Sequence, residues 1–364
     1  MTLAFDGVLF FPVTPFDAAG RVDTGLLGEH IAGRLGYGPG GVFPACGTGE
    51  FHALSTAEIA RVVAVAVETV GGRMPVIAGS GGGLGDALET ARSAADAGAD
   101  GLLLLPPALV TGTADGLIAW VETIAETAAL PVIVYHRGTA GYTPDAIRRL
   151  AAHPLVAGFK DGTGDIGRTQ EIVLAAGEIA RTTGRPLAFF NGLLTAELTQ
   201  GAYRGIGVPL YSSAAFAMIP EVAALHYRAC ANGDESVRLA LLDGFYRPLV
   251  ALRDETPGFG VSLVKAGLRL RGLPVGGVRP PLVDPTPEQE RRLAGILERG
   301  LELAAELGGA AGTGADAVGA ASAKAGAGAD AAGAAADGSA STAGPGADAA
   351  GRPTASAPAA RVGR

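Results

Sequence analysis

Short apolar runs alternate with longer amphipathic stretches from residue 7 to about residue 220. Each run and the stretch after it take roughly 25 to 30 residues, which is typical of repeated βα units and a parallel sheet. Eight such units predict an α/β fold, a closed (β/α)8 TIM barrel with its helices outside. The predicted strands are "GVLFFPV" (7–13), "GGVFPAC" (40–46), "MPVIAGS" (74–80), "DGLLLLP" (100–106), "PVIVYH" (131–136), "VAGFK" (156–160), "LAFF" (187–190) and "IGVPLY" (206–211).

The stretches between these strands carry helix signals. "STAE" at 55–58 is a capping box, with Ser55 at the N-cap and Glu58 three residues later, and Pro144 in "TPD" stands at a first helical position. These starts agree with helices that follow each strand. Helices are predicted over 56–70, 85–97, 115–128, 144–152, 166–180 and 194–203.

The chain changes character beyond the eighth strand. Residues 221–307 predict additional C-terminal helices that pack beside the barrel. From Gly308 onward small and polar residues dominate, and Val318 and Val362 are the only large aliphatic side chains. Such a segment cannot bury enough surface to offset the entropy of ordering it. We therefore predict a barrel with its helical extension over 1–307 and a disordered Ala/Gly-rich tail over 308–364.

Charge and composition exclude several classes of partner. The net charge is -8 and no basic block occurs, so neither nucleic acid nor a membrane surface is an expected partner. The apolar runs are too short to cross a bilayer, and the N-terminus lacks the positive start of a secretory signal, which predicts a cytoplasmic protein. Two cysteines and five scattered histidines show no metal-ligand spacing, so we expect no metal.

Lysine is rare in this chain. Among 28 Lys and Arg residues only Lys160, Lys265 and Lys324 are lysines. Lys160 ends the predicted sixth strand, and TIM-barrel active sites lie at the C-terminal ends of strands. An apolar barrel mouth lowers the pKa of a lysine, and the neutral amine can form an iminium with a ketone. Position alone also allows Lys160 to reach solvent or to pair with Asp161 or Asp165.

Two neighbouring segments extend this interpretation. Tyr135 ends the fifth strand, so its phenol could face the amine and carry protons, or could simply cap the core. "CGTGEF" at 46–51 ends the second strand, where its backbone N–H groups could hold a carboxylate or form a plain connection. "GSGGGLG" at 79–85 lacks the dinucleotide-binding spacing, because position 84 is Leu.

Five segments resemble, in order and spacing, the family of dihydrodipicolinate synthase and N-acetylneuraminate lyase: "FPVTPFD", "GTGEF", "GADGLLLLPP", "VIVYHR" and "VAGFKDGTGD". The likeness covers residues 7 to about 300. It implies a TIM-barrel lyase in which Lys160 forms a Schiff base and Tyr135 assists it. It also implies that Gly47 and Thr48 contact the carboxylate of a 2-oxo acid, and that the chain forms a homo-oligomer, a dimer or a tetramer.

Within that family, "GTGEF", "FKDGTGD", "FFNGLLTAE" (189–197) and "LYSSAAF" (210–216) are similar to a branch that dehydrates and decarboxylates 5-dehydro-4-deoxyglucarate to 2,5-dioxopentanoate. The likeness implies a small-molecule 2-oxo sugar-acid substrate and no cofactor, because the lysine itself supplies the electron sink. Gly192 and Ser213 stand at positions that line the hydroxyl-bearing end of the substrate, although a loop glycine and a helix cap would explain them as well.

Some residues depart from the family pattern. Ala108 stands where a relay tyrosine is common, Ala217 replaces a frequent asparagine, Leu194 an expected proline and Cys46 a usual glycine. Two other functions therefore stay open: an aldolase or lyase on another 2-oxo sugar acid, and a non-catalytic sugar-acid sensor. A generic phosphate-binding barrel is disfavoured, since the eighth strand's "PLYSSAAF" lacks a glycine-rich turn.

Overall fold

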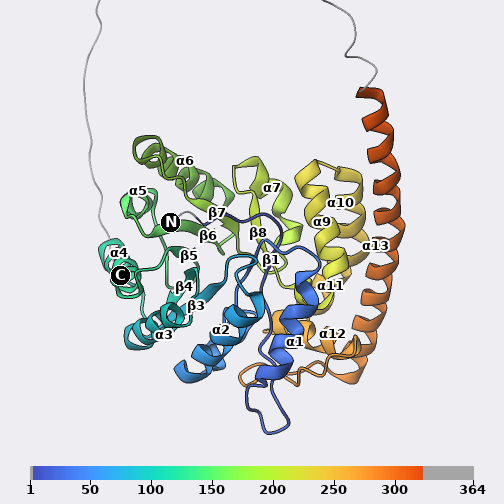
Figure 1. Ribbon diagram of the computed structural model, residues 1–364, viewed down its shortest axis with the longest axis horizontal. Helices are drawn as coiled ribbons and strands as arrows, with labels where there is room; N and C mark the ends of the chain where they lie inside the picture. The colour runs from blue at the N-terminus through green and yellow to red at the C-terminus, as the bar shows by residue number, and fades with distance from the viewer. Residues whose placement is uncertain (1–2, 323–364) are drawn as a thin grey trace, which may run out of the picture. The chain divides into compact units, whose positions relative to one another are not determined.

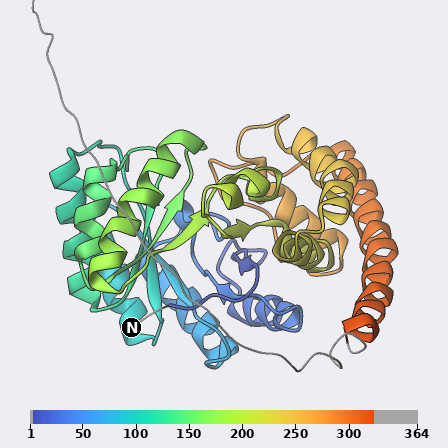
Figure 2. The same cartoon turned by 90° about the horizontal axis from the view of Figure 1, so that it is seen from above.

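The computed structural model describes residues 3–322, and their side chains as far as residue 308. Eight parallel strands surround a common axis, with helices on the outside (Figures 1 and 2). The strands are β1 (Leu9–Phe10), β2 (Gly41–Val42), β3 (Ile77–Gly82), β4 (Gly101–Pro107), β5 (Val132–His136), β6 (Val156–Asp161), β7 (Ala188–Asn191) and β8 (Leu210–Ser213).

The strands close into a barrel. Hydrogen-bonded neighbours follow the order β2-β1-β8-β7-β6-β5-β4-β3, and a parallel bridge between Val42 and Val76 joins the two ends of that order. Each strand overlaps the apolar run predicted for it. The TIM barrel expected from the sequence is therefore confirmed.

Both faces of the strands are buried, which explains their nearly continuous apolar sequences. On β5, Ile133 and Tyr135 pack inside the barrel with Leu103 of β4, whereas Val132 and Val134 pack outward beneath the helices. Because side chains alternate along a strand, this register fixes Tyr135 on the inner face near the C-terminal end of β5.

Most helices between the strands agree with the sequence prediction. The capping box at Ser55 is present with both of its hydrogen bonds, and Pro144 lies in the first turn of α5. One helix that the pattern did not single out, α1, begins after Asp23, whose carboxylate accepts the N–H of Leu26. The helices are α1 (Thr24–Leu35), α2 (Thr56–Val70), α3 (Leu84–Asp96), α4 (Ala114–Ala128), α5 (Pro144–Ala152) and α6 (Ile166–Thr183).

The predicted helix over 194–203 is broken in the structure. A 3-10 turn, η2 (Ala196–Leu198), precedes a short helix, α7 (Gln200–Gly205). Thr195 adopts a left-handed conformation with φ of 51°. The Asn191 amide donates to the Ala196 carbonyl and to Gln200 Oε1, which draws this turn onto the end of β7. Side-chain hydrogen bonds to the backbone compete here with a continuous helix.

The additional C-terminal helices lie together beside the barrel, as the sequence predicted (Figure 2). Gly300 of the last helix packs against Phe245 so closely that a Cβ atom there would lie 2.6 Å from the Phe245 ring. These elements are α8 (Ala215–Met218), α9 (Pro220–Asn232), α10 (Glu235–Leu241), the π-helical η3 (Leu242–Tyr246), α11 (Arg247–Arg253), α12 (Phe259–Leu270) and α13 (Pro287–Ser322).

The described residues up to Gly314 form one compact unit, and a second unit begins at Ala315. The backbone of residues 308–322 continues helix α13, and alanine, which has the highest helix propensity, is frequent in this stretch. The boundary at 308 and the disordered tail over 308–364 stay predictions. The rest of the predicted tail, 323–364, lies outside the described residues. Across 3–322, no helix combines the length and the apolar character that crossing a membrane requires.

Candidate active site

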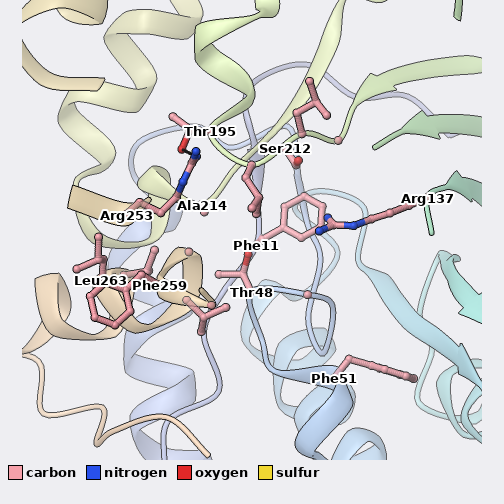
Figure 3. A pocket seen from close by; sticks show the side chains of 18 of the residues that line it. Phe11, Thr48, Phe51, Arg137, Thr195, Ser212, Ala214, Arg253, Phe259 and Leu263 are labelled. Atoms are coloured by element: carbon pink, nitrogen blue, oxygen red, sulfur yellow. Dashed lines mark hydrogen bonds between the residues drawn. The ribbon is translucent and has the colours of Figure 1, made fainter. Parts of the chain in front are cut away.

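A cavity of about 790 Å³ opens at the C-terminal ends of the barrel strands (Figure 3). Its floor and one wall come from strand ends and the loops after them, including Phe11, Leu103 and Tyr135. Residues of α11, α12 and the segment between them, 249–264, form much of the opposite wall. Five of the six site residues predicted from the sequence line it: Gly47, Thr48, Tyr135, Lys160 and Gly192.

Lys160 lies at the bottom of this cavity. Its side chain is only 6% exposed, and its Nζ atom is 4.3 Å from the centre of the Phe11 ring and 4.5 Å from that of Tyr135. Burial disfavours the ammonium form and lowers the pKa of Lys160, and Arg137 also acts to lower it, although the groups at Tyr135 and Cys46 act to raise it. The site thus favours an uncharged, nucleophilic amine more than water does.

The simpler interpretations of Lys160 are not supported. The amine is buried rather than solvated, and neither Asp161 nor Asp165 pairs with it among the described residues. Asp161 accepts hydrogen bonds from Thr163 and Tyr203, and Asp165 caps the N-terminus of α6. Both carboxylates are committed to local structure, so within residues 3–308 no carboxylate pairs with the amine to hold it protonated.

Tyr135 and Lys160 are direct register partners across β5 and β6. The Tyr135 hydroxyl donates to the carbonyl oxygen of Gly192 at 3.0 Å and accepts from Arg137 Nη1 at 2.9 Å. The phenol oxygen is therefore oriented by one donor and one acceptor. Tyr135 is inside the barrel and close to the amine, the position that its predicted role in proton transfer requires.

Gly192 makes room for the lysine. A Cβ atom at this position would lie 2.6 Å from Lys160 Cε and 2.7 Å from the Asp161 carbonyl oxygen. Its N–H donates to that same carbonyl at 2.6 Å. Glycine is therefore required for the close approach of the β7 loop to β6, which is a stronger reason than loop flexibility.

The loop after β2 presents Gly47 and Thr48 to the cavity. Gly47 faces open space, because a Cβ atom there would meet no other atom within 4 Å. The loop is fixed from beneath by Thr14, whose hydroxyl donates to the Gly49 carbonyl at 2.7 Å. Exposed backbone N–H groups on a fixed loop are suited to bind a carboxylate.

Ser213 does not line the cavity. Its hydroxyl donates to Glu197 Oε1 at 2.5 Å and accepts the N–H of Phe216 in the first turn of α8. The period of two along β8 turns Ser213 away from the cavity, and the preceding Ser212 lines it instead. Burial raises the pKa of the Glu197 carboxyl to about 7.

Two cations of the cavity were not singled out from the sequence. Arg137 follows β5 two residues after Tyr135, and no carboxylate in the described part of the chain pairs with it. Arg253 extends from α11 on the other side, where it contacts Asp254 and donates to Thr195 Oγ1 at 2.8 Å (Figure 3). The quoted "VIVYHR" contained Arg137, whereas nothing in the sequence pattern placed α11 at the barrel mouth.

Ala108 stands where a relay tyrosine is common in the family, and it supplies no hydroxyl to the cavity. Ala108 follows β4 and does not line the cavity, and its N–H donates to the Gly82 carbonyl at 3.0 Å. Tyr135 is the only tyrosine among the cavity-lining residues in the part of the chain that the structure describes. Over the same residues, no group of three or more His, Cys, Asp or Glu side chains is arranged to hold a metal ion.

Comparison with known proteins gives close relatives over most of the chain. The model of the dihydrodipicolinate synthetase family matches residues 4–299. "Probable 5-dehydro-4-deoxyglucarate dehydratase 1" of Streptomyces avermitilis is 47% identical over 300 residues, which is 82% of this chain and 95% of the relative. A protein from Rhizobium rhizogenes, also named "Probable 5-dehydro-4-deoxyglucarate dehydratase", is 42% identical over 293 residues, 80% of this chain and 94% of the relative.

Solved structures agree with the fold. Dihydrodipicolinate synthase from Oceanobacillus iheyensis superposes with a TM-score of 0.73 at 26% identity, covering 81% of this chain and 96% of the other. The synthase from Aquifex aeolicus gives a TM-score of 0.70 at 26% identity, covering 81% of this chain and 98% of the other.

Proposed function

The chain belongs to the dihydrodipicolinate synthetase family, and on that premise we propose that it dehydrates and decarboxylates 5-dehydro-4-deoxyglucarate to 2,5-dioxopentanoate through a Schiff base. The observation that carries the chemistry is the environment of Lys160, a buried amine with a lowered pKa beside Tyr135. The substrate is supported by relatives that carry this dehydratase name at 42 to 48% identity.

Lys160 begins the reaction as a nucleophile. Its neutral amine attacks the ketone carbon, C2 when counting from the adjacent carboxylate, and loss of water from the carbinolamine leaves an iminium. Gly47 and Thr48 hold the adjacent carboxylate through the loop after β2, and Gly192 lies beside the lysine chain. The iminium acidifies the C3 methylene, and Tyr135 relays the proton that C3 loses.

The enamine then expels the C4 hydroxyl, which takes up a proton and leaves as water. The product is a conjugated iminium, with C2=N next to C3=C4, and C5 is attached to its far end. The C5–C6 bond breaks, its electron pair moves into this conjugated system, and the distal carboxylate leaves as carbon dioxide. Protonation of the resulting dienamine, tautomerisation of the C5 enol to an aldehyde and hydrolysis return Lys160. One water and one carbon dioxide are released for each substrate consumed.

Arg137 supports a dicarboxylate over a monocarboxylate substrate. It extends into the cavity without a carboxylate partner among the described residues, and it donates to Tyr135, whose ring contacts the amine. A guanidinium in this position pairs with the distal carboxylate of an acid whose ketone has condensed with Lys160. The corresponding substrate of a 2-keto-3-deoxysugar acid aldolase lacks that carboxylate. A contact between Arg137 and the distal carboxylate therefore distinguishes the dehydratase from the aldolase.

The decisive experiment is borohydride trapping followed by intact-mass measurement. Wild-type protein and Lys160→Ala are each incubated with 5-dehydro-4-deoxyglucarate or with pyruvate, and carbon dioxide release is followed. We expect a trapped adduct and carbon dioxide only with the wild type. An adduct with pyruvate but none with the glucarate compound would indicate an aldolase on another acid, and no adduct with either would indicate a sensor.

Arg137→Gln tests the dicarboxylate preference, with Arg149→Gln as a matched control. Arg149 pairs with Asp115 on the surface, outside the cavity. Loss of the contact to the distal carboxylate raises KM for the glucarate compound by about tenfold or more. Arg137 also donates to Tyr135, so the reference is trapping by pyruvate, which has no distal carboxylate and whose half-saturating concentration should change much less. An unchanged KM in Arg137→Gln would contradict the assignment.

The proposal extends to the cellular location and the oligomeric state of the protein. We place it in the cytoplasm, as an enzyme of sugar-acid breakdown that needs no nucleic acid or membrane partner. We further propose a homo-oligomer, a dimer or a tetramer, which light scattering of the purified chain would test.

A further inference from the structure

Lys265 is the second of the rare lysines, and it lies fully buried on α12. Its Nζ atom is 2.6 Å from Glu50 Oε1 and donates to the Gly277 carbonyl at 2.8 Å. The same nitrogen lies 3.9 Å from the centre of the Phe16 ring. A carboxylate at ion-pair distance, a carbonyl acceptor and an aromatic face therefore surround the ammonium group. The planar fork of an arginine does not fit this compact arrangement, which explains the use of lysine.

Glu50 directly follows the Gly47–Thr48–Gly49 loop. Its backbone is left-handed, with φ of 58°, a conformation that costs free energy for a residue other than glycine. Its N–H donates to the Gly47 carbonyl at 3.1 Å, so the Glu50 backbone is hydrogen-bonded directly to the loop. The Glu50 side chain itself does not line the cavity.

Arg279 is the third residue that contacts the Lys265–Glu50 pair. Glu50 Oε2 accepts the backbone N–H of Arg279 at 2.8 Å. The Arg279 guanidinium in turn pairs with Glu58 of the α2 capping box and donates to the Ala53 carbonyl at 2.7 Å. The Glu50 carboxylate is thus connected both to α12 and to the segment after it, while Glu50 itself ends the loop after β2.

These contacts join two walls of the cavity that are far apart in the sequence. Phe259, Leu263 and Val264 of α12 line the cavity on the helix that carries Lys265, and Gly47 and Thr48 line it on the loop that ends at Glu50. We propose that the buried Lys265–Glu50 pair is a positioning device that holds the Gly47–Thr48 loop in the conformation that binds the carboxylate next to the reacting ketone.

The inference rests on the proposed function, because it assigns that loop to the 2-oxo-acid carboxylate. A pair that served stability alone would change the melting temperature when broken, but it would not change the affinity of folded molecules for a 2-oxo acid. A positioning pair changes that affinity. The carboxylate contact exists before and after condensation, so its loss raises the concentration needed for half-saturation and leaves the extent of reaction at saturation unchanged.

The test uses pyruvate, which has only the carboxylate and the ketone. Adduct formation in the presence of borohydride is measured against pyruvate concentration for wild type, Glu50→Gln, Lys265→Met and the double variant Glu50→Gln/Lys265→Met. The double variant leaves no uncompensated buried charge. Its half-saturating pyruvate concentration can therefore be measured even where Lys265→Met alone fails to fold. Glu221→Gln is the matched control, because Glu221 pairs with Arg271 at 2.7 Å next to the far end of α12, away from the loop.

We expect Glu50→Gln and the double variant to raise the half-saturating pyruvate concentration by about tenfold or more, with full labelling at saturation. The control should shift it by less than about twofold. Equal half-saturation in wild type and in folded, charge-neutralised variants would overturn the positioning role while leaving the Schiff-base function intact. No adduct in the wild type would overturn both.

Discussion

Lys160 and Tyr135 are register partners on adjacent strands, and the lysine nitrogen lies 4.5 Å from the centre of the tyrosine ring. The pairing follows from the parallel β5–β6 ladder, which fixes both side chains on the inner face of the barrel at the same height. An amine and a phenol are thereby brought together without any flexible loop. Rigid strands hold a catalytic pair more accurately than loops do, which favours attack on a bound ketone.

The pH dependence of adduct formation should report the environment of Lys160. Burial lowers the pKa of this amine below its ordinary value of 10.5, so the neutral form accumulates at lower pH than in a solvated lysine. The rate of pyruvate trapping should rise with pH and reach its plateau below 10.5. Stopped-flow or quenched trapping across a pH series measures this. A rate that is still rising in proportion to hydroxide above that pH would contradict it.

Replacing the buried amine should stabilise the fold. The folded pKa of Lys160 is lowered, so between the folded and unfolded pKa values the unfolded chain binds more protons and stability increases with pH. Lys160→Met removes this cost at neutral pH and keeps the apolar stem. We expect a gain of about 0.5–2 kcal/mol in the free energy of unfolding, with complete loss of activity. Urea denaturation at neutral pH measures the gain, and a destabilised variant would show that Lys160 contributes more through packing than burial costs.

Gly192→Ala should abolish most of the activity. Its methyl group would lie 2.6 Å from Lys160 Cε, so either the lysine or the β7 loop must shift. A displacement of about 1 Å at a reacting group costs roughly 100-fold in rate, and we expect kcat/KM to fall by at least that factor. Gly205→Ala is the control, since a methyl group there meets nothing within 4 Å. Comparable activity of the two variants would show that the amine tolerates the crowding.

Acid should remove one contribution to stability that Glu58 makes. Hydrogen bonds from Arg279 lower the pKa of Glu58 from 4.5 to about 2. The stabilisation is present above pH 4.5 and is lost as the pH falls toward 2. Glu58→Gln should cost about 1 kcal/mol at pH 7, allowing for solvent screening of this partly exposed pair. Equilibrium unfolding of both proteins from pH 7 to 3 tests this; a difference that does not shrink with acid would assign the cost to packing instead.

The sequence by itself determined the strands, their order along the chain and the place of Lys160 near the end of β6. Continuous apolar runs followed by capped helices leave few alternatives to a closed parallel barrel, since strand period and helix caps are local properties. Lys160, Tyr135, Gly47 and Thr48 could be selected because each ends a strand or follows one, and strand ends gather at one face of the barrel, whereas Gly192 was selected through the family resemblance. Ser213 failed by one residue, because a shift of one position along β8 exchanges the inner and outer faces.

Only the tertiary structure decided what surrounds those residues. The pKa of Lys160 is lowered first by burial, and that burial depends on contacts between segments that are distant in the sequence. The same holds for Lys265 and Glu50, which are separated by more than two hundred residues and meet only when α12 packs over the barrel mouth. A sequence pattern describes the face of each element, but partners that meet through packing become visible only when all the elements are in place.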